Sequence, residues 1–142
     1  METSELGAFL AGERKVVCAT LGPRGLPHVV ALGFALLDGR VWCWSYAKAQ
    51  KVRNLERDPR ATLLFEAGDS YRDYRGAMLE CDVRIHRGEG DVRRVGWALA
   101  ARYDPDAIRH AIDAQAAKRV ALEFVVRRQS SYDHRMLPAG VY

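Results

Sequence analysis

The sequence predicts one small, mainly β domain: a β-barrel of about six antiparallel strands with peripheral helices. Residues 75–87 alternate between apolar and polar side chains, which is the period of a strand with one buried face. Other short apolar segments are separated by turn signals such as Asp38-Gly39. The chain has 142 residues without an internal repeat or linker, so we expect a single domain over residues 1–142.

Composition narrows the class of protein. Hydrophobic residues make up 49% and charged residues 28%, as in ordinary globular domains. No apolar run approaches the roughly 20 residues of a membrane span, and the acidic start lacks the layout of a signal peptide. We therefore expect a cytoplasmic protein without a membrane partner. The net charge of +4 comes without a nucleic-acid motif, which favours a small anionic ligand over nucleic acid.

The cysteines and histidines do not form a recognisable metal site. Cys18, Cys43 and Cys81 are odd in number, lack CxxC spacing and lie in expected strands, so we expect buried thiols and neither a disulfide framework nor a zinc site. The four histidines are scattered along the chain.

The first elements are a helix and a strand. Thr3 or Ser4 is a suitable cap for a helix through about Gly12, and its apolar stripe is expected to close one end of the barrel. A strand over 15–21 follows, with a turn at 22–25.

Residues 27–37 read as one long strand that is apolar on both faces. An antiparallel strand with one wet face should alternate, so this pattern implies cover on both sides and predicts a dimer interface. Gly33 indicates a bulge or a close backbone approach. After the hairpin turn, residues 40–45 form the next strand, with Trp42 and Trp44 expected on opposite faces, one in the core and one beside a planar ring.

A short basic helix is expected between Ser45, as its cap, and Asp58-Pro59, which ends it. Its apolar side carries Val52 and Leu55. At 100° per residue the opposite side carries polar and small residues, namely Ala47, Gln50, Lys51 and Asn54. Free N–H groups, the helix dipole and a lysine make a seat for a phosphate. The alternative is a solvated helix that covers the barrel mouth.

Strands are expected over 60–66, 75–87 and 118–128, with a polar, aromatic loop at 68–74 and a polar tail from 129. Residues 91–103 are expected to be helical, and Asp104-Pro105 should begin a second helix with Ile108 on its apolar side. In the strand at 75–87 the alternation divides two sets of side chains. The inward set is Ala77, Leu79, Cys81, Val83 and Ile85, and the outward set is Met78, Glu80, Asp82, Arg84 and His86.

Several common chemistries are absent from the sequence. It has no GxGxxG, no GxxxxGK[ST] and no GxSxG motif. The remaining candidates are His28, at the start of a strand, and Arg75, which is suited to bidentate binding of a phosphate or carboxylate. A surface or interface role for His28 and an ion pair of Arg75 with Asp73 remain open.

Four segments carry a resemblance to a known family: residues 25–30 (GLPHVV), 38–42 (DGRVW), 50–60 (QKVRNLERDPR) and 71–76 (YRDYRG). Together they resemble the flavin and deazaflavin oxidoreductases of the split β-barrel fold, the pyridoxamine 5′-phosphate oxidase-like superfamily, over about Leu6 to Val126. The lysine followed by xRNLxxDPR is the most specific match, to the phosphate-binding helix. Tyr74 stands where the family's YRxLRG segment has a leucine.

The resemblance implies a homodimer with cofactor sites at the subunit interface. It places five residues around the cofactor phosphate: Ser45, Lys48, Gln50, Lys51 and Asn54. It places four along the ring system: His28, Val29, Val30 and Trp44. Arg75 and Tyr132 are further candidates.

The KxRNLxxDPR form resembles the branch that uses the deazaflavin coenzyme F420, with FMN as the alternative cofactor. Lys48, Arg53 and Arg57 offer charge for the F420 tail. The implied function is hydride transfer from reduced F420 to an unsaturated or quinone-like small molecule. The alternatives are an FMN-binding oxidoreductase of the same fold and a protein that holds a cofactor or haem without turnover. No residue is assigned as catalytic, and the proton comes from water or a tyrosine such as Tyr71.

Overall fold

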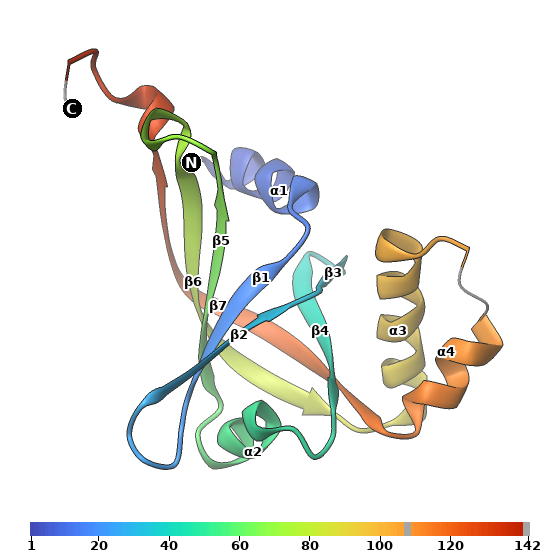
Figure 1. Cartoon of the computed structure of the whole chain (residues 1–142). Helices are drawn as coiled ribbons and strands as arrows, with labels where there is room; N and C mark the ends of the chain where they lie inside the picture. Colours follow the sequence, from blue (N-terminus) through green and yellow to red (C-terminus); the bar gives the residue numbers. More distant parts are fainter. Residues whose placement is uncertain (107–108, 141–142) are drawn as a thin grey trace.

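A computed structural model describes residues 1–106 and 109–140. Within them, one antiparallel sheet of 7 strands curls around the core in the order β2-β1-β5-β6-β7-β4-β3 (Figure 1). The strands are β1 (Val16–Leu21), β2 (Pro27–Leu32), β3 (Ala35–Leu37), β4 (Arg40–Tyr46), β5 (Arg60–Ala67), β6 (Arg75–His86) and β7 (Arg119–Asp133).

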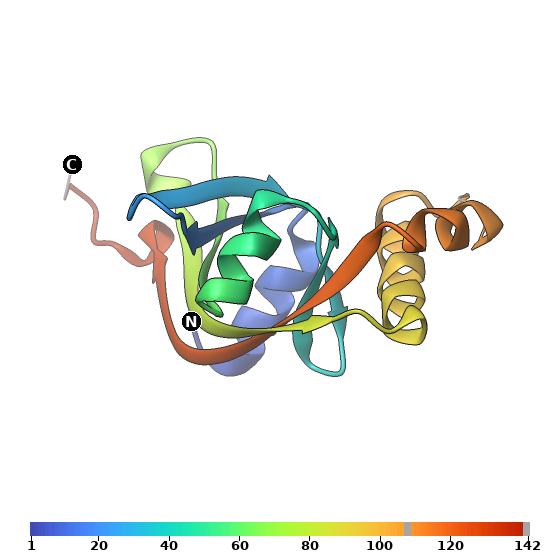
Figure 2. The same cartoon turned by 90° about the horizontal axis from the view of Figure 1, so that it is seen from below.

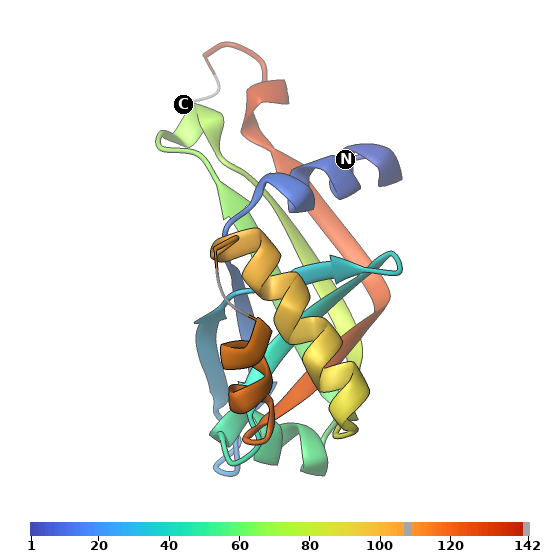
Figure 3. The same cartoon turned by 90° about the vertical axis from the view of Figure 1, so that its right-hand side faces the viewer.

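The helices fall into two groups. Viewed from below, α2 (Gln50–Arg57) and, behind it, α1 (Thr3–Gly12) lie within the curl of the sheet (Figure 2), at opposite ends of the molecule in Figure 1. The pair α3 (Glu89–Tyr103) and α4 (Arg109–Ala116) stands beside β4, outside the curl (Figure 3). Short 3-10 turns, η1 (Tyr71–Asp73) and η2 (His134–Met136), lie together at the far end of β6 and β7.

The core confirms the predicted alternation. All the inward residues of β6 are buried except the half-buried Ile85, and they pack against Leu6 and Leu10 of α1 and Val52 and Leu55 of α2. The expected closure of one end by the first helix is therefore observed, and α2 closes the other. All three cysteines are free and buried, as expected.

The expected strand over 27–37 is two strands, which raises the number from six to seven. After Leu32 the chain leaves β2 at one edge of the sheet and enters β3 at the other edge. Between them, the N–H of the buried Phe34 donates to the hydroxyl of Tyr103 at 3.1 Å. A Cβ at Gly33 would lie 3.4 Å from the Tyr103 ring, which confirms the predicted close approach. The apolar residues of a continuous segment such as 27–37 do not show that its two halves join opposite edges of the sheet.

Other expectations need correction. The N-cap of α1 is Glu2, whose N–H donates to the Glu5 carboxylate at 3.0 Å, and not Thr3 or Ser4. Trp42 and Trp44 lie on the same face of β4 and pack with the α3–α4 pair. That result follows from the two-residue period of a strand.

Two boundaries also differ. Residues 105 and 106 form a turn, so the predicted start of a helix at Pro105 is wrong, and Ile108 lies outside the described residues. Strand β7 continues to Asp133, because residues 129–133 pair with Arg75–Leu79 of β6. No helix among the described residues is both long and apolar enough to cross a membrane.

Candidate functional site

Helix α2 begins later than predicted. Its N-cap is Ala49, and residues 46–49 form a turn in which the Ala49 N–H donates to the Tyr46 carbonyl at 3.1 Å. Ser45 is therefore not the cap: it is buried in β4, paired with Val120 of β7, and its hydroxyl donates to the Tyr46 carbonyl. Pairing within the sheet therefore holds Ser45 in β4, although a serine is a preferred residue for a helix N-cap.

Asn54 lies inside the fold, although its polarity had suggested the open side of α2. Its side chain is 0% exposed. Its Nδ2 donates to Thr20 Oγ1 at 3.0 Å, and its Oδ1 accepts from Gln50 Nε2 at 2.7 Å. Asn54 thus fastens α2 to β1 and orients Gln50 at the helix N-terminus, because both halves of its amide are used.

Lys51 is a half-buried cation in the first turn of α2. Burial is the main cause that lowers the pKa of its ammonium from the ordinary value. Cys18 and Cys43 act to raise this pKa, and the charge of Arg119 acts to lower it. No carboxylate in the described part of the chain forms an ion pair with it. Burying a charge without a counter-ion costs free energy, and a bound anion would offset that cost.

The same end of the molecule carries further unpaired cations. Among the described residues, none of the following has an ion-pair partner: Arg24, Lys48, Lys51, Arg53, Arg57, Lys118 and Arg119. The nearby acids are already used, since Glu56 pairs with Arg87 at 2.9 Å and Asp58 with Arg60 at 2.8 Å. Positive charge around a helix N-terminus attracts an anion.

A pocket of 180 Å³ adjoins α2 beneath the β1–β2 hairpin. Gln50 lines it from the helix and His28 from β2. The Nδ1 atom of His28 is shielded from solvent and has no hydrogen-bond partner in the described residues. Buried polar atoms usually find a partner, so an unpaired ring nitrogen is suited to a polar group of a ligand.

The valines that follow His28 point to opposite sides of β2. Val30 pairs with the inward-facing Cys18 and is half-buried, whereas Val29 pairs with Ala19 on the outer face and is 61% exposed. Only Val30 therefore shares the His28 side of the strand.

The structure does not bring Trp44 and Arg75 into this group within one chain. The Trp44 indole donates to the Val92 carbonyl of α3 at 2.9 Å, and a Cβ on Gly96 would lie 2.6 Å from its ring. Arg75 starts β6 at the far end of the sheet, where its guanidinium lies 5.9 Å from the centre of the Phe9 ring of α1. The same end holds an aromatic cluster of Tyr71, Tyr74 and Tyr132 around His134.

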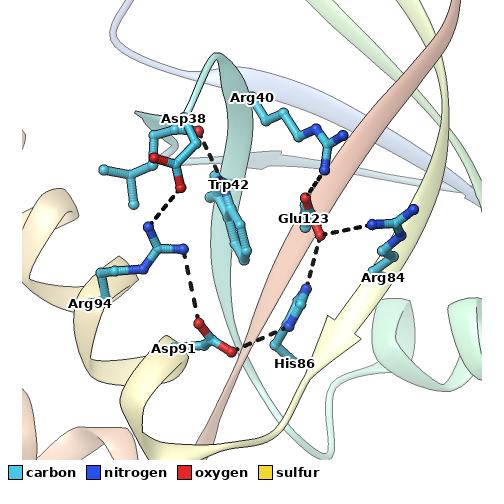
Figure 4. A network of polar contacts seen from close by, with 9 residues as sticks. Asp38, Arg40, Trp42, Arg84, His86, Asp91, Arg94 and Glu123 are labelled. Atoms are coloured by element: carbon cyan, nitrogen blue, oxygen red, sulfur yellow. Dashed lines mark hydrogen bonds and ion pairs between the residues drawn. The ribbon is translucent and has the colours of Figure 1, made fainter.

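Sequence reasoning missed a polar network on the outer face, under α3 (Figure 4). Glu123 of β7 is 6% exposed and accepts hydrogen bonds from Arg40 and His86. Burial opposes ionisation, but these two bonds outweigh it and the pKa of Glu123 is lowered. A glutamate inside an apolar strand, flanked by Leu122 and Phe124, was the available signal.

The network continues from His86 to Asp91 and Arg94 of α3, and from Arg94 to Asp38 (Figure 4). All the side chains of this network have polar partners, so we interpret the network as a structural connection between α3 and the sheet. Among the described residues, no group of at least three His, Cys, Asp or Glu side chains is arranged to hold a metal ion.

In a comparison with protein families, a model described as pyridoxamine 5′-phosphate oxidase matches residues 3–131. Comparison with curated proteins gives no match.

Several solved structures are similar. The conserved hypothetical protein Rv2991 from Mycobacterium tuberculosis is 37% identical, with a TM-score of 0.91 over 97% of this chain and 89% of that one. An F420 reductase is 23% identical, with a TM-score of 0.71 over 87% of this chain and 94% of that one. HutZ, a haem storage protein from Vibrio cholerae, is 13% identical, with a TM-score of 0.72 over 92% and 93%. The last two show likeness of fold alone.

Proposed function

Because the chain belongs to the pyridoxamine 5′-phosphate oxidase family, we propose that it is an oxidoreductase that transfers a hydride from reduced coenzyme F420 to an unsaturated or quinone-like small molecule. The observation that supports this most strongly is Lys51, which is half-buried at the N-terminus of α2, lies within the K-V-R-N-L-E-R-D-P-R segment and has no ion-pair partner among the described residues. A phosphate there supplies the missing negative charge.

The residues around the N-terminus of α2 fit a phosphorylated ring cofactor. Lys51 and the free N–H groups of α2 hold the phosphate, and Gln50 donates to it from the position that Asn54 fixes. His28 offers Nδ1 to a polar atom of the ring system, and Val30 lies on the same side of β2. Lys48, Arg53 and Arg57 add positive charge for an acidic tail.

The cofactor supplies the hydride chemistry when bound. The protein's part is to orient the ring, exclude water and hold the acceptor, so no side chain needs to act as a nucleophile. FMN is the second candidate because it shares a ring system and a phosphate with F420, and the same cations would bind it. Storage of a cofactor or haem without turnover is the third.

We propose that the site is completed in a homodimer. The outer face of β2, β1, β5 and the first half of β6 is covered by no helix of the described residues (Figure 1), and it carries the exposed side chains of Val29 and Met78, at 61% and 40%. A second copy of the chain suits this face, because it exposes apolar side chains and is continuous with the strand that carries His28. Arg75 contacts a cofactor only if the partner subunit brings the two ends together.

Titration of the purified protein with F420 and with FMN, followed by fluorescence, tests the proposal. Tight F420 binding, weak FMN binding and reduction of a quinone by the loaded protein are the expected results. The reverse order of affinities would assign the chain to FMN. Binding of neither would refute the proposed function.

A further inference from the structure

Arg119 begins the strand that pairs with the end of β4, next to the turn that leads into α2, although it is remote from α2 in sequence. It is the first residue of β7 and pairs with Tyr46, the last residue of β4. One residue earlier, the Lys118 carbonyl accepts from the Ala47 N–H at 2.9 Å. These contacts join the start of β7 to the turn that leads into α2.

The side chain of Arg119 is held between two aromatic rings. Its guanidinium carbon lies 3.8 Å from the centre of the Tyr46 ring and 4.9 Å from that of Trp44. Trp44 is itself fixed by its hydrogen bond to Val92 and its close packing on Gly96. A guanidinium stacked on ring faces keeps its N–H groups, which lie in its plane, free to point outward.

Those N–H groups are almost unused. The one hydrogen bond that Arg119 donates within the described residues is long, 3.5 Å to Gln115 Oε1. No described carboxylate lies within ion-pair distance of Arg119 or of Lys51. Burial is the main cause that lowers the pKa of Lys51. Cys18 and Cys43 act to raise this pKa, and the charge of Arg119 adds a smaller lowering effect. Two neighbouring cations without a counter-ion repel each other unless an anion lies between or beside them.

We propose that Arg119 is a binding residue for a second anionic group of the ligand whose phosphate Lys51 binds. This inference rests on the proposed function of the α2 site. It assigns the ligand to the class of molecules that carry at least two negative charges at one end, either on one terminal phosphate or on a phosphate and a nearby carboxylate. The aromatic support keeps the guanidinium edge oriented before the ligand arrives, which lowers the entropic cost of binding.

The test compares Arg119→Gln with wild-type protein in fluorescence titrations with F420 and FMN at several salt concentrations. Loss of one charge-assisted contact should raise the Kd on the order of 10- to 100-fold. The dependence of Kd on salt should also become weaker, because fewer charges are screened. Arg119→Lys keeps the charge but loses the planar guanidinium that stacks on the two rings, so an intermediate Kd is expected.

Arg14 provides a matched control. It is an exposed arginine whose guanidinium carbon lies 5.8 Å from the centre of the Tyr103 ring, outside the α2 group. Arg14→Gln removes the same charge and should leave the Kd unchanged. Thermal unfolding of each variant separates loss of binding from loss of fold, and Arg119→Lys carries the test if Arg119→Gln is unstable.

The outcomes separate the two proposals. If Lys51→Ala weakens binding and Arg119→Gln binds as the wild type does, this inference is overturned and the proposed function stands. If Arg14→Gln weakens binding as much as Arg119→Gln, a specific contact is likewise refuted. If the wild type binds neither cofactor, both the proposed function and this inference are refuted.

Discussion

The Nε2 atom of His86 lies 3.0 Å from Oε1 of Glu123, which joins β6 to β7 on the face that α3 covers (Figure 4). The other ring nitrogen lies 3.4 Å from Oδ2 of Asp91, in the first turn of α3. A neutral imidazole carries one N–H and serves one of these carboxylates, whereas a protonated ring serves both. The arrangement therefore ties the first turn of α3 to the sheet through polar contacts of one ring.

Glu123→Gln should lower the free energy of unfolding by about 1–3 kcal/mol, because it removes the acceptor charge that Arg40 and His86 share in a buried position. Chemical denaturation measures the change. Glu66→Gln, the same substitution at an exposed position of β5, is the control and should change stability by less than about 0.5 kcal/mol. Equal effects of the two variants would contradict a stabilising role for the network.

The effect of Glu123→Gln should depend on pH. The pKa of Glu123 in the folded protein is lowered from 4.5, so its charged form is favoured by folding. Its contribution is fully present above pH 4.5 and is lost as the pH falls through the folded-state pKa. The stability difference between wild type and variant should therefore shrink as the pH falls below about pH 4.5. A difference that persists at low pH would assign the effect to packing.

The hydrogen bond between Asn54 and Thr20 should be measurable as a coupling. Asn54→Ala and Thr20→Val each remove one partner of a buried 3.0 Å bond. Each should cost about 1–3 kcal/mol, because the remaining group stays buried without a partner. The double variant should cost less than the sum, with a coupling of roughly 0.5–3 kcal/mol. Additive costs would show that the bond contributes nothing.

Much of the site follows from sequence, but its inner supports do not. The basic helix, its end at Asp58-Pro59 and the alternation of β6 were predicted, because local periodicity determines them. Asn54 was placed on the open side by its polarity. Its burial depends on Thr20 of β1, 34 residues away in sequence, which a helical repeat does not reveal.

The position of Ser45 shows the same limit. Its type suits a helix cap, but pairing with Val120 keeps it in β4 and moves the helix start to Ala49. The break at Gly33 is similar, since the apolar run continues while the chain crosses from one sheet edge to the other. Non-local pairing decides both cases.

Gly96 of α3 should tolerate no side chain. A Cβ there would lie 2.6 Å from the Trp44 ring and 2.9 Å from Ile112, so Gly96→Ala should destabilise the protein by about 1–3 kcal/mol. Gly90→Ala is the matched control in the same helix. Nothing lies within 4 Å of that Cβ, and alanine should stabilise α3 by about 0.5–1 kcal/mol. Thermal unfolding of both variants checks the opposite signs, and two equal shifts would contradict the packing.

Lys51→Met should separate binding from stability. The half-buried ammonium has no counter-ion in the described part of the chain, and burial lowers its pKa. Replacing it with an apolar side chain of similar length should raise the free energy of unfolding, on the order of 0.5 kcal/mol. The same change should weaken F420 binding by about 1.5–3 kcal/mol. Denaturation and titration measure the two effects, and Lys15→Met, at an exposed position outside the α2 group, is the control. Loss of stability with unchanged affinity would refute the assigned role.

Val29→Lys should prevent the proposed dimer. Val29 is 61% exposed on the outer face of β2, directly opposite Ala19 of β1. A lysine there places a charge in an interface where the two-fold axis brings identical surfaces together, so each substitution acts twice. Light scattering after size exclusion should show a dimer for the wild type and a monomer for the variant. Ala101→Lys, at an exposed position of α3, is the control and should remain dimeric. Since the site is proposed to lie at the interface, the monomeric variant should also bind F420 more weakly. A dimeric Val29→Lys protein would place the interface on another face.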